Sequence, residues 1–225
     1  MSESQHQSSP QPVIQVFALG DFQTNCMIVT DGEPEPGKPC LIVDCGYDPE
    51  PMLDAVESQQ LKPQRIVLTH AHADHIAGLN ELYQRLGSIP ISIHQSEESW
   101  LNDPMLNLSA ALGLSVTAPM PDSFLEEDDR VEIGSIEFEI RETPGHSPGG
   151  ISLIHAPSNT AIVGDSLFNG SIGRTDFPGS SFDTLAASIR SKLYTLDPNT
   201  RVYPGHGPTT TIGNEKQSNP FVPAE

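Results

Sequence analysis

A dense group of metal-binding side chains lies in segment 69–75, which reads Thr-His-Ala-His-Ala-Asp-His. His70 and His72 are two positions apart, so in an extended chain their rings project to the same side. Asp74 and His75 follow in the first turn of a predicted helix and are directed past it. Three imidazoles and a carboxylate are donors for divalent cations, and this spacing separates them into two pairs, as a site for two metal ions requires. A polar loop with incidental histidines would rarely collect four such donors.

Three further fragments each place one histidine or aspartate in a turn of glycine and proline at the end of a predicted strand. His146 lies in Thr-Pro-Gly-His-Ser-Pro-Gly-Gly, Asp165 ends Ile-Val-Gly-Asp, and His206 lies in Val-Tyr-Pro-Gly-His-Gly. Glycine and proline fix unusual backbone geometry, and loops at strand ends are where sites are usually assembled. Each fragment alone is a weak signal, but together and in this order they predict one site.

The elements that must position these side chains are short. Hydrophobic periodicity predicts helices over 49–59, 74–86 and 182–196, and strands over 13–19, 25–30, 40–43, 65–68, 91–94 and 201–203, with hairpins over 130–133/136–141 and 151–155/161–164. Segment 96–122 mixes apolar residues with proline and asparagine, and two interpretations stay open: an irregular helical lid over a pocket, or helix packed on the core. No composition break marks a second domain, so we expect a disordered tail over 1–12 and a single domain over 13–225.

The charge balance excludes several classes of partner. Acidic residues outnumber basic ones by 30 to 11, which gives a formal net charge of -19. Such a field repels phosphate backbones and anionic lipids, so we expect neither nucleic acid nor membrane as a partner, whereas bound cations would offset part of the charge. No apolar run is long enough to span a bilayer, and residues 1–12 lack the features of a signal peptide. Three cysteines without a C-x-x-C spacing favour a reducing cytoplasm.

The four fragments together resemble the metallo-β-lactamase superfamily of metallohydrolases. A narrower similarity, to its glyoxalase II-like branch, rests on Gly-Asp-Ser-Leu-Phe at 164–168, Gly-Ser-Ile-Gly-Arg-Thr-Asp-Phe-Pro at 170–178, Pro-Gly-His-Gly-Pro at 204–208 and Asn-Pro-Phe at 219–221. The resemblance implies an α+β fold, a four-layer αββα sandwich of two packed sheets with helices outside. It also implies a first metal held by His70, His72 and His146, a second held by Asp74, His75 and His206, and a bridge through Asp165.

This resemblance implies a binuclear metal-dependent hydrolase that acts on a small-molecule substrate. We expect a thioester such as S-lactoylglutathione, attacked by a metal-bridging hydroxide, with Asp74 as the catalytic proton acceptor. No further histidine, glutamate or tyrosine has an evident role toward a leaving group, and a thioester needs none because its thiolate leaves with a pKa of about 8.5. We expect two divalent ions per chain. The donor set of imidazole and carboxylate suits zinc, iron and manganese alike, and of these we expect zinc.

Arg174 is the expected substrate-binding residue, because basic residues are scarce and its guanidinium could hold a carboxylate. A surface ion pair is the alternative, and Asp176 either orients Arg174 or caps a turn. Full-length glyoxalase II enzymes carry a C-terminal helical region that helps to hold glutathione. Here the chain ends soon after Asn-Pro-Phe, so we expect that region to be absent, and glutathione specificity is open.

A second interpretation is an oxidoreductase similar to the persulfide dioxygenases. That branch shares Gly-Arg-Thr-Asp-Phe and uses one iron ion at the first site. Its members typically read Pro-Ala-His-Asp around the last histidine, whereas this chain reads Pro-Gly-His-Gly, which favours the hydrolase. His94, His155, Cys26 and Cys45 lie outside the motifs, and we expect structural roles for them.

Overall fold

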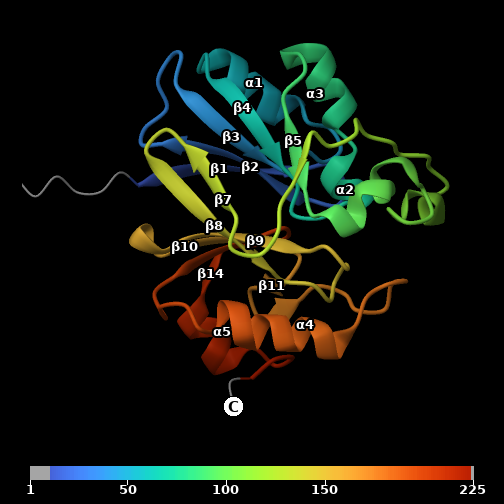
Figure 1. Cartoon of the computed structure of the whole chain (residues 1–225), viewed down its shortest axis with the longest axis vertical. Helices are drawn as coiled ribbons and strands as arrows, with labels where there is room; N and C mark the ends of the chain where they lie inside the picture. The colour runs from blue at the N-terminus through green and yellow to red at the C-terminus, as the bar shows by residue number, and fades with distance from the viewer. Residues whose placement is uncertain (1–10, 224–225) are drawn as a thin grey trace, which may run out of the picture.

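The computed structural model describes residues 11–223 and consists of two six-stranded sheets stacked face to face with helices on their outer faces (Figure 1). The first sheet has the order β1-β2-β3-β4-β5-β6. Its strands are β1 (Pro12–Leu19), β2 (Thr24–Asp31), β3 (Pro39–Val43), β4 (Lys62–Val67), β5 (Ile91–Ile93) and β6 (Ser123–Phe124). The predicted αββα sandwich is confirmed.

The second sheet has the order β14-β13-β10-β9-β8-β7, and β11 pairs with β12 as a separate two-stranded ribbon. These strands are β7 (Arg130–Ile133), β8 (Ile136–Glu142), β9 (Ile151–His155), β10 (Thr160–Gly164), β11 (Leu167–Phe168), β12 (Ser171–Ile172), β13 (Arg201–Pro204) and β14 (Thr210–Thr211). Both predicted hairpins, β7–β8 and β9–β10, are present.

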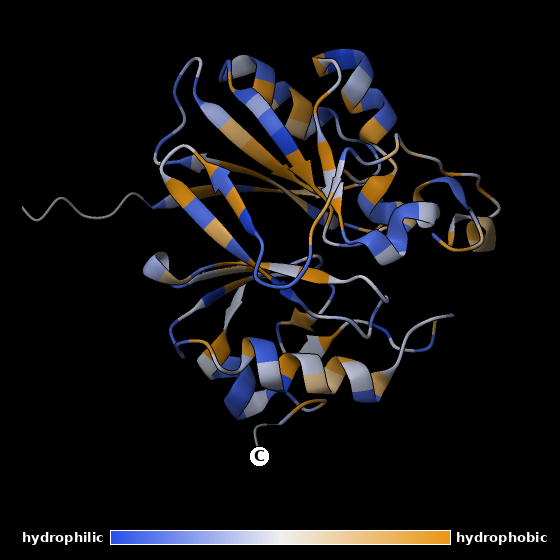
Figure 2. Cartoon of the chain, viewed as in Figure 1, coloured by the Kyte–Doolittle hydropathy of each residue, from blue (hydrophilic) through white to orange (hydrophobic). Residues whose placement is uncertain are grey.

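Alternation along the strands divides the hydrophobic core into layers. On β2, Cys26 and Ile28 pack in the layer that holds α1 (Glu50–Ser58) and α3 (Leu79–Leu86), while Met27 and Val29 face the other sheet. A third layer lies between the second sheet and α4 (Phe182–Ser188). Figure 2 shows hydrophobic residues along the strands of both sheets and on the helices, with hydrophilic residues between them. Successive side chains of a strand point to opposite faces of the sheet, so an apolar run such as that of β2 buries both faces. Strands of this kind favour a layered sandwich.

The chain turns at one edge of the sandwich deliver the predicted donors. β3 runs parallel to β4, and β10 runs parallel to β13, so the C-terminal ends of each pair lie together. His70 follows β4, Asp165 follows β10 and His206 follows β13. A bridge between Thr24 and His206 ties the start of β2 to the loop after β13. The topology therefore gathers motifs that are far apart in the sequence.

Two predicted helices differ from the structure. The helix over 74–86 is two helices, α2 (Ala73–Ile76) and α3. The backbone nitrogen of Gly78 donates to Cys45 O at 2.9 Å, and a Cβ at Gly78 would overlap Gly46 O, so contact with the loop after β3 breaks the helix there. The helix over 182–196 is α4 followed by a π-helical turn, η4 (Ile189–Leu193), in which Tyr194 N donates to Ile189 O.

The ends of the chain were only partly predicted. Residues 1–10 of the expected tail lie outside the described residues, and Pro12 begins β1 rather than ending a tail. The helix α5 (Ile212–Ser218) and the two-residue strands β6, β11, β12 and β14 were not predicted, because such short runs carry no measurable periodicity. Within 11–223 no helix is both long enough and apolar enough to cross a membrane.

Segment 96–122 combines its two interpretations. Its first part, the 3₁₀ helix η1 (Gln95–Asn102), buries Trp100 and Leu101 in the core. Its second part contains η2 (Ser109–Leu112), in which Leu112 is half exposed beside a cavity. The segment therefore both packs on the core and forms one wall of the site.

Candidate metal centre

The structure brings all seven predicted donors together in three overlapping groups whose ligand atoms lie within 4.8 Å of one another. The groups are His70, His72 and His146; His70, His75 and Asp165; and Asp74, His75 and His206. The four histidines nearest the core are buried, and Asp74, Asp165 and His206 are half-buried. Imidazole and carboxylate groups at these separations are suited to divalent cations.

Facing imidazole nitrogens define the first group. His72 Nδ1 lies 2.9 Å from His146 Nε2. His146 Nδ1 lies 2.8 Å from the backbone oxygen of Arg174. Because a carbonyl oxygen only accepts, the proton of His146 is on Nδ1, and its Nε2 presents a lone pair to His72.

The third imidazole of this group is oriented through a chain of hydrogen bonds. Thr69 Oγ1 donates to Asp44 Oδ2 at 2.7 Å, so it accepts from His70 Nδ1 at 3.1 Å. That places the lone pair of His70 on Nε2, which is buried and has no hydrogen-bond partner among residues 11–223. A buried imidazole nitrogen without a partner is costly unless a cation occupies the space before it.

The second group repeats this arrangement. His75 Nδ1 lies 2.8 Å from Asp44 Oδ2, and His206 Nδ1 donates to the backbone oxygen of Phe22 at 3.1 Å. The Nε2 atoms therefore face the carboxylates: His206 Nε2 is 3.1 Å from Asp74 Oδ2, and His75 Nε2 is 3.7 Å from the same oxygen. Outer hydrogen bonds of this kind fix the tautomer and orientation of metal-ligating histidines.

Asp165 lies between the two groups. Its Oδ1 is 3.4 Å from His75 Nε2, and its Oδ2 is 3.5 Å from both His146 Nε2 and His206 Nε2. Close backbone packing holds it there, because a Cβ at Gly205 would overlap Asp165 Oδ1. One carboxylate thus faces histidines of both groups, as a bridging ligand would.

The electrostatics of the two groups differ. Burial, with the neighbouring imidazoles, lowers the pKa of His70 far below its usual range and that of His72 to about 3. Burial opposes protonation of His75 and His206 too, but Asp74, Asp165 and, for His75, Asp44 raise the pKa of both. His70 and His72 are therefore uncharged and ready to bind a cation, whereas a cation at the second group competes with protons on His75 and His206.

The carboxylates are held ionised. Burial raises the pKa of Asp165, but His75, His146 and His206 outweigh it and lower that pKa to about 2. For Asp74, burial is likewise outweighed by His75 and His206 and by Thr24 Oγ1, which donates to Asp74 Oδ2 at 3.0 Å, and the pKa falls. Both side chains can act as anionic ligands near neutral pH.

Two buried acids that position the donor loops were missed by the sequence reasoning. Asp44 accepts from Thr69 N at 2.8 Å as well as from His75, and it has a left-handed backbone with φ of 59°. Glu97 accepts from Ala71 N at 2.6 Å and from Gly149 N at 2.7 Å, so it joins the His70–His72 turn to the loop of His146. An acid directly after the apolar strand β3 was a signal for Asp44, but Glu97 had none in the sequence.

A cavity of about 590 Å³ opens over the donors. Its lining includes His72, Asp74, His146, Asp165 and His206, together with Arg174 and mainly apolar side chains. Arg174 donates through Nε and Nη2 to Asp176 at 2.9 and 2.8 Å, and its guanidinium carbon lies 4.2 Å from the ring centroid of Phe177. Arg174 is thus both at the site and in an exposed ion pair, and Asp176 orients it.

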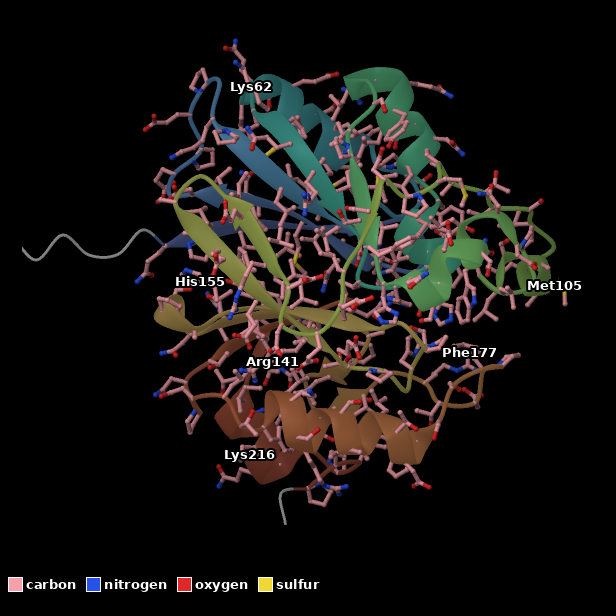
Figure 3. All side chains as sticks on the ribbon, in the orientation of Figure 1. Lys62, Met105, Arg141, His155, Phe177 and Lys216 are labelled. Carbon is pink, nitrogen blue, oxygen red and sulfur yellow. The ribbon has the colours of Figure 1, made fainter. Side chains whose placement is uncertain are left out.

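The remaining candidates lie outside this cavity. His94 contacts Ser96 and Glu142, and His155 Nδ1 lies 2.6 Å from Ser158 Oγ. In the view of Figure 3, His155 lies on the opposite side of the molecule from Phe177, which lines the cavity. Cys26, Cys40 and Cys45 are buried free thiols, and Cys26 Sγ accepts from Gly46 N. None of these five residues belongs to the three donor groups found among residues 11–223.

Comparison with known proteins identifies relatives over nearly the whole chain. The family model that matches residues 19–206 is described as the metallo-beta-lactamase superfamily. A Bacillus subtilis protein named "Probable metallo-hydrolase YqgX" is 40% identical over 91% of this chain and 94% of its own length. The Haemophilus influenzae hydroxyacylglutathione hydrolase GloC is 36% identical over 93% of this chain and 97% of its own.

Solved structures agree with the fold. The structure titled BLEG-1 B3 metallo-beta-lactamase has a TM-score of 0.87 and 39% identity, covering 93% of this chain and 99% of that one. The structure of TTHA1623 in a di-iron-bound form has a TM-score of 0.79 and 37% identity, covering 94% of this chain and 99% of that one.

Proposed function

The chain belongs to the metallo-beta-lactamase superfamily, and from that premise we propose that this metal-dependent hydrolase is a binuclear thioesterase. The first substrate class to test is hydroxyacyl thioesters of glutathione, of which S-lactoylglutathione is the example. The observation that carries the proposal is the sharing of one carboxylate, Asp165, between two histidine groups. The 36% identity to a hydroxyacylglutathione hydrolase supports the substrate class.

Each group would hold one cation: His70, His72 and His146 the first, Asp74, His75 and His206 the second, with Asp165 binding both. Two bound divalent ions supply hydroxide near neutral pH and polarise a carbonyl group. The orphaned Nε2 of His70 and the facing nitrogens of His72 and His146 fit that occupancy. We propose zinc as the metal at both sites, and iron or manganese would fit the same donors.

Asp74 is the proposed proton acceptor. It lines the cavity, and His75, His206 and Thr24 keep it ionised. Its position between the second histidine group and the cavity lets it take a proton from the attacking group.

The lining of the cavity favours a thioester over an amide. Among the described residues that line it there is no lysine, tyrosine or glutamate to donate a proton to a departing amine. A thiolate leaves without one, because its conjugate acid has a pKa of about 8.5. Arg174 would hold a substrate carboxylate at the rim of the cavity.

The three buried free thiols support a cytoplasmic location for the protein.

The test uses protein loaded separately with zinc, manganese and, without oxygen, iron(II). Thiol release from S-lactoylglutathione should depend on metal and be lost in Asp165→Asn. Two further substrates decide between alternatives. Oxygen uptake with glutathione persulfide would favour the dioxygenase, and faster opening of a β-lactam than of any thioester would favour a lactamase.

A further inference from the structure

Large apolar side chains line much of the cavity. We define the apolar wall as five of them: Phe22, Leu108, Leu112, Phe168 and Phe177. Leu112 is 50% exposed and Phe22 is 46% exposed. Large apolar side chains left in water at the mouth of a site are typical of a surface that a ligand covers.

Leu108 holds its place in the wall against its own backbone preference. Its φ is 69°, a left-handed conformation that is unusual for a bulky residue without a side-chain acceptor. Residues in strained backbone conformations cluster at ligand-binding sites, where the surrounding contacts hold the conformation in place.

Contacts of the buried residue Asn107 hold the backbone at Leu108 in this conformation. Its side-chain nitrogen donates to Trp100 O at 2.9 Å and to Val116 O at 3.0 Å, and its Oδ1 accepts from Ser109 N at 3.1 Å. Its backbone oxygen accepts from Ala73 N at 2.8 Å, one residue before Asp74. The part of the wall at Leu108 is therefore fixed directly to the segment that carries Asp74, and its position relative to the proposed reacting centre is set.

Away from the donor groups, the protein side chains of the cavity offer little net positive charge to a ligand. Among its described lining residues, Arg174 is the one permanent cation, and Asp176 neutralises it through two hydrogen bonds. The chain as a whole carries -19. Away from the donor groups, a ligand therefore gains more by burying carbon than by burying charge.

We infer that the apolar wall binds an apolar group of several carbons on the substrate, so that the preferred thioester carries an alkyl or aryl chain beside the scissile bond. This inference rests on the proposed thioesterase function and adds the substrate class that the wall selects. The chain can be on the acyl side or on the thiol side of the thioester, because the burial of its methylene groups has the same effect on either.

The experiment compares chain length at constant charge. One series is the acetyl, butanoyl and hexanoyl thioesters of uncharged N-acetylcysteamine, and the other is the methyl and hexyl thioesters of acetic acid. Each buried methylene strengthens binding by about fourfold, so one series should gain at least about tenfold in kcat/KM from its shortest to its longest member.

Leu112→Ser should lower that gain at least about threefold. Leu114→Ser is the matched control, because Leu114 is 48% exposed in the same segment but does not line the cavity. It should keep the gain of the unmodified protein. The inference is overturned if neither series gains from added methylenes, or if Leu112→Ser and Leu114→Ser behave alike.

A binding measurement separates this inference from the proposed function. Calorimetry with the S-methyl and S-hexyl thioethers of N-acetylcysteamine, which cannot be hydrolysed, needs no turnover. If no thioester is cleaved but S-hexyl binding is tighter and depends on Leu112, the proposed function fails and the wall stands. If thioesters are cleaved and both thioethers bind equally, the wall fails and the function stands.

Discussion

His72 Nδ1 and His146 Nε2 face each other at 2.9 Å, although the residues are 74 positions apart in the sequence. His146 donates from Nδ1 to the backbone oxygen of Arg174, and burial lowers the pKa of His72 to about 3. Near neutral pH His72 is therefore uncharged, and a cation between the two facing nitrogens would accept a lone pair from each. Arg174 thus contributes its backbone to the site as well as its side chain.

Asp165→Asn should reduce metal content at both sites, because the amide carries no charge and Asp165 faces histidines of both groups. Asp176→Asn is the control, since Asp176 accepts hydrogen bonds from Arg174 and belongs to none of the three donor groups. Metal content per chain after equilibration with excess zinc and desalting provides the measurement. Full metal content in Asp165→Asn would refute its role as a bridge.

Glu97→Gln should weaken metal binding at the first site by about tenfold, because an amide nitrogen would meet one of the two backbone donors, Ala71 N or Gly149 N. The unpaired donor should also cost about 1–3 kcal/mol in the free energy of unfolding. Glu98→Gln, one residue further along and half-buried, is the control. Competition with a chromophoric chelator measures the affinity, and equal affinity in the two variants would exclude a positioning role for Glu97.

Arg174→Ala and Asp176→Asn should shift KM for an anionic thioester in opposite directions. Removing the guanidinium takes away the cation at the rim, so KM should rise about threefold to tenfold. Removing the charge of Asp176 frees that cation, so KM should fall. Steady-state kinetics on charged and uncharged thioesters test this, and shifts of the same sign in both variants would show that Arg174 has only a structural role.

Stability should fall as the pH rises above about 9. Burial raises the pKa of Cys40 to about 12, and it also raises the pKa of Cys26 and Cys45, so these thiols stay protonated in the folded chain. In the unfolded chain thiols ionise near pH 8.5, so unfolding releases protons in this window and the folded state loses stability with rising pH.

Each buried thiol contributes at most about 1.4 kcal/mol per pH unit to that slope. Urea unfolding of the wild type and of Cys40→Ala between pH 8 and pH 11 measures it. The variant should lose less stability over this range, and equal slopes would contradict the assignment.

Much of the fold could be predicted from the sequence because its signals are local. The apolar run from Cys26 to Val29 predicts a strand, which the structure buries on both faces, and the turns of glycine and proline mark strand ends. The break at Gly78 could not be predicted, since it depends on Cys45 and Gly46 from another loop.

The donors of the site could be predicted, but not the residues that position them. The donors are concentrated in motifs, whereas Glu97 acts through backbone atoms of two distant loops. The strain at Leu108 is likewise set by contacts of Asn107 that no sequence spacing reveals. Residues that act through backbone partners leave little trace in a single sequence.

The most direct test of the account is the metal content of three proteins after saturation with zinc and removal of unbound ion. The wild type should hold two ions per chain, and His146→Ala and His206→Ala should each keep about one, because each variant loses a donor from one group only. Cobalt(II) substitution should then give different visible spectra for the two variants, since the remaining ions have different donors. At most one ion in the saturated wild type, or identical spectra in the two variants, would contradict a two-metal centre.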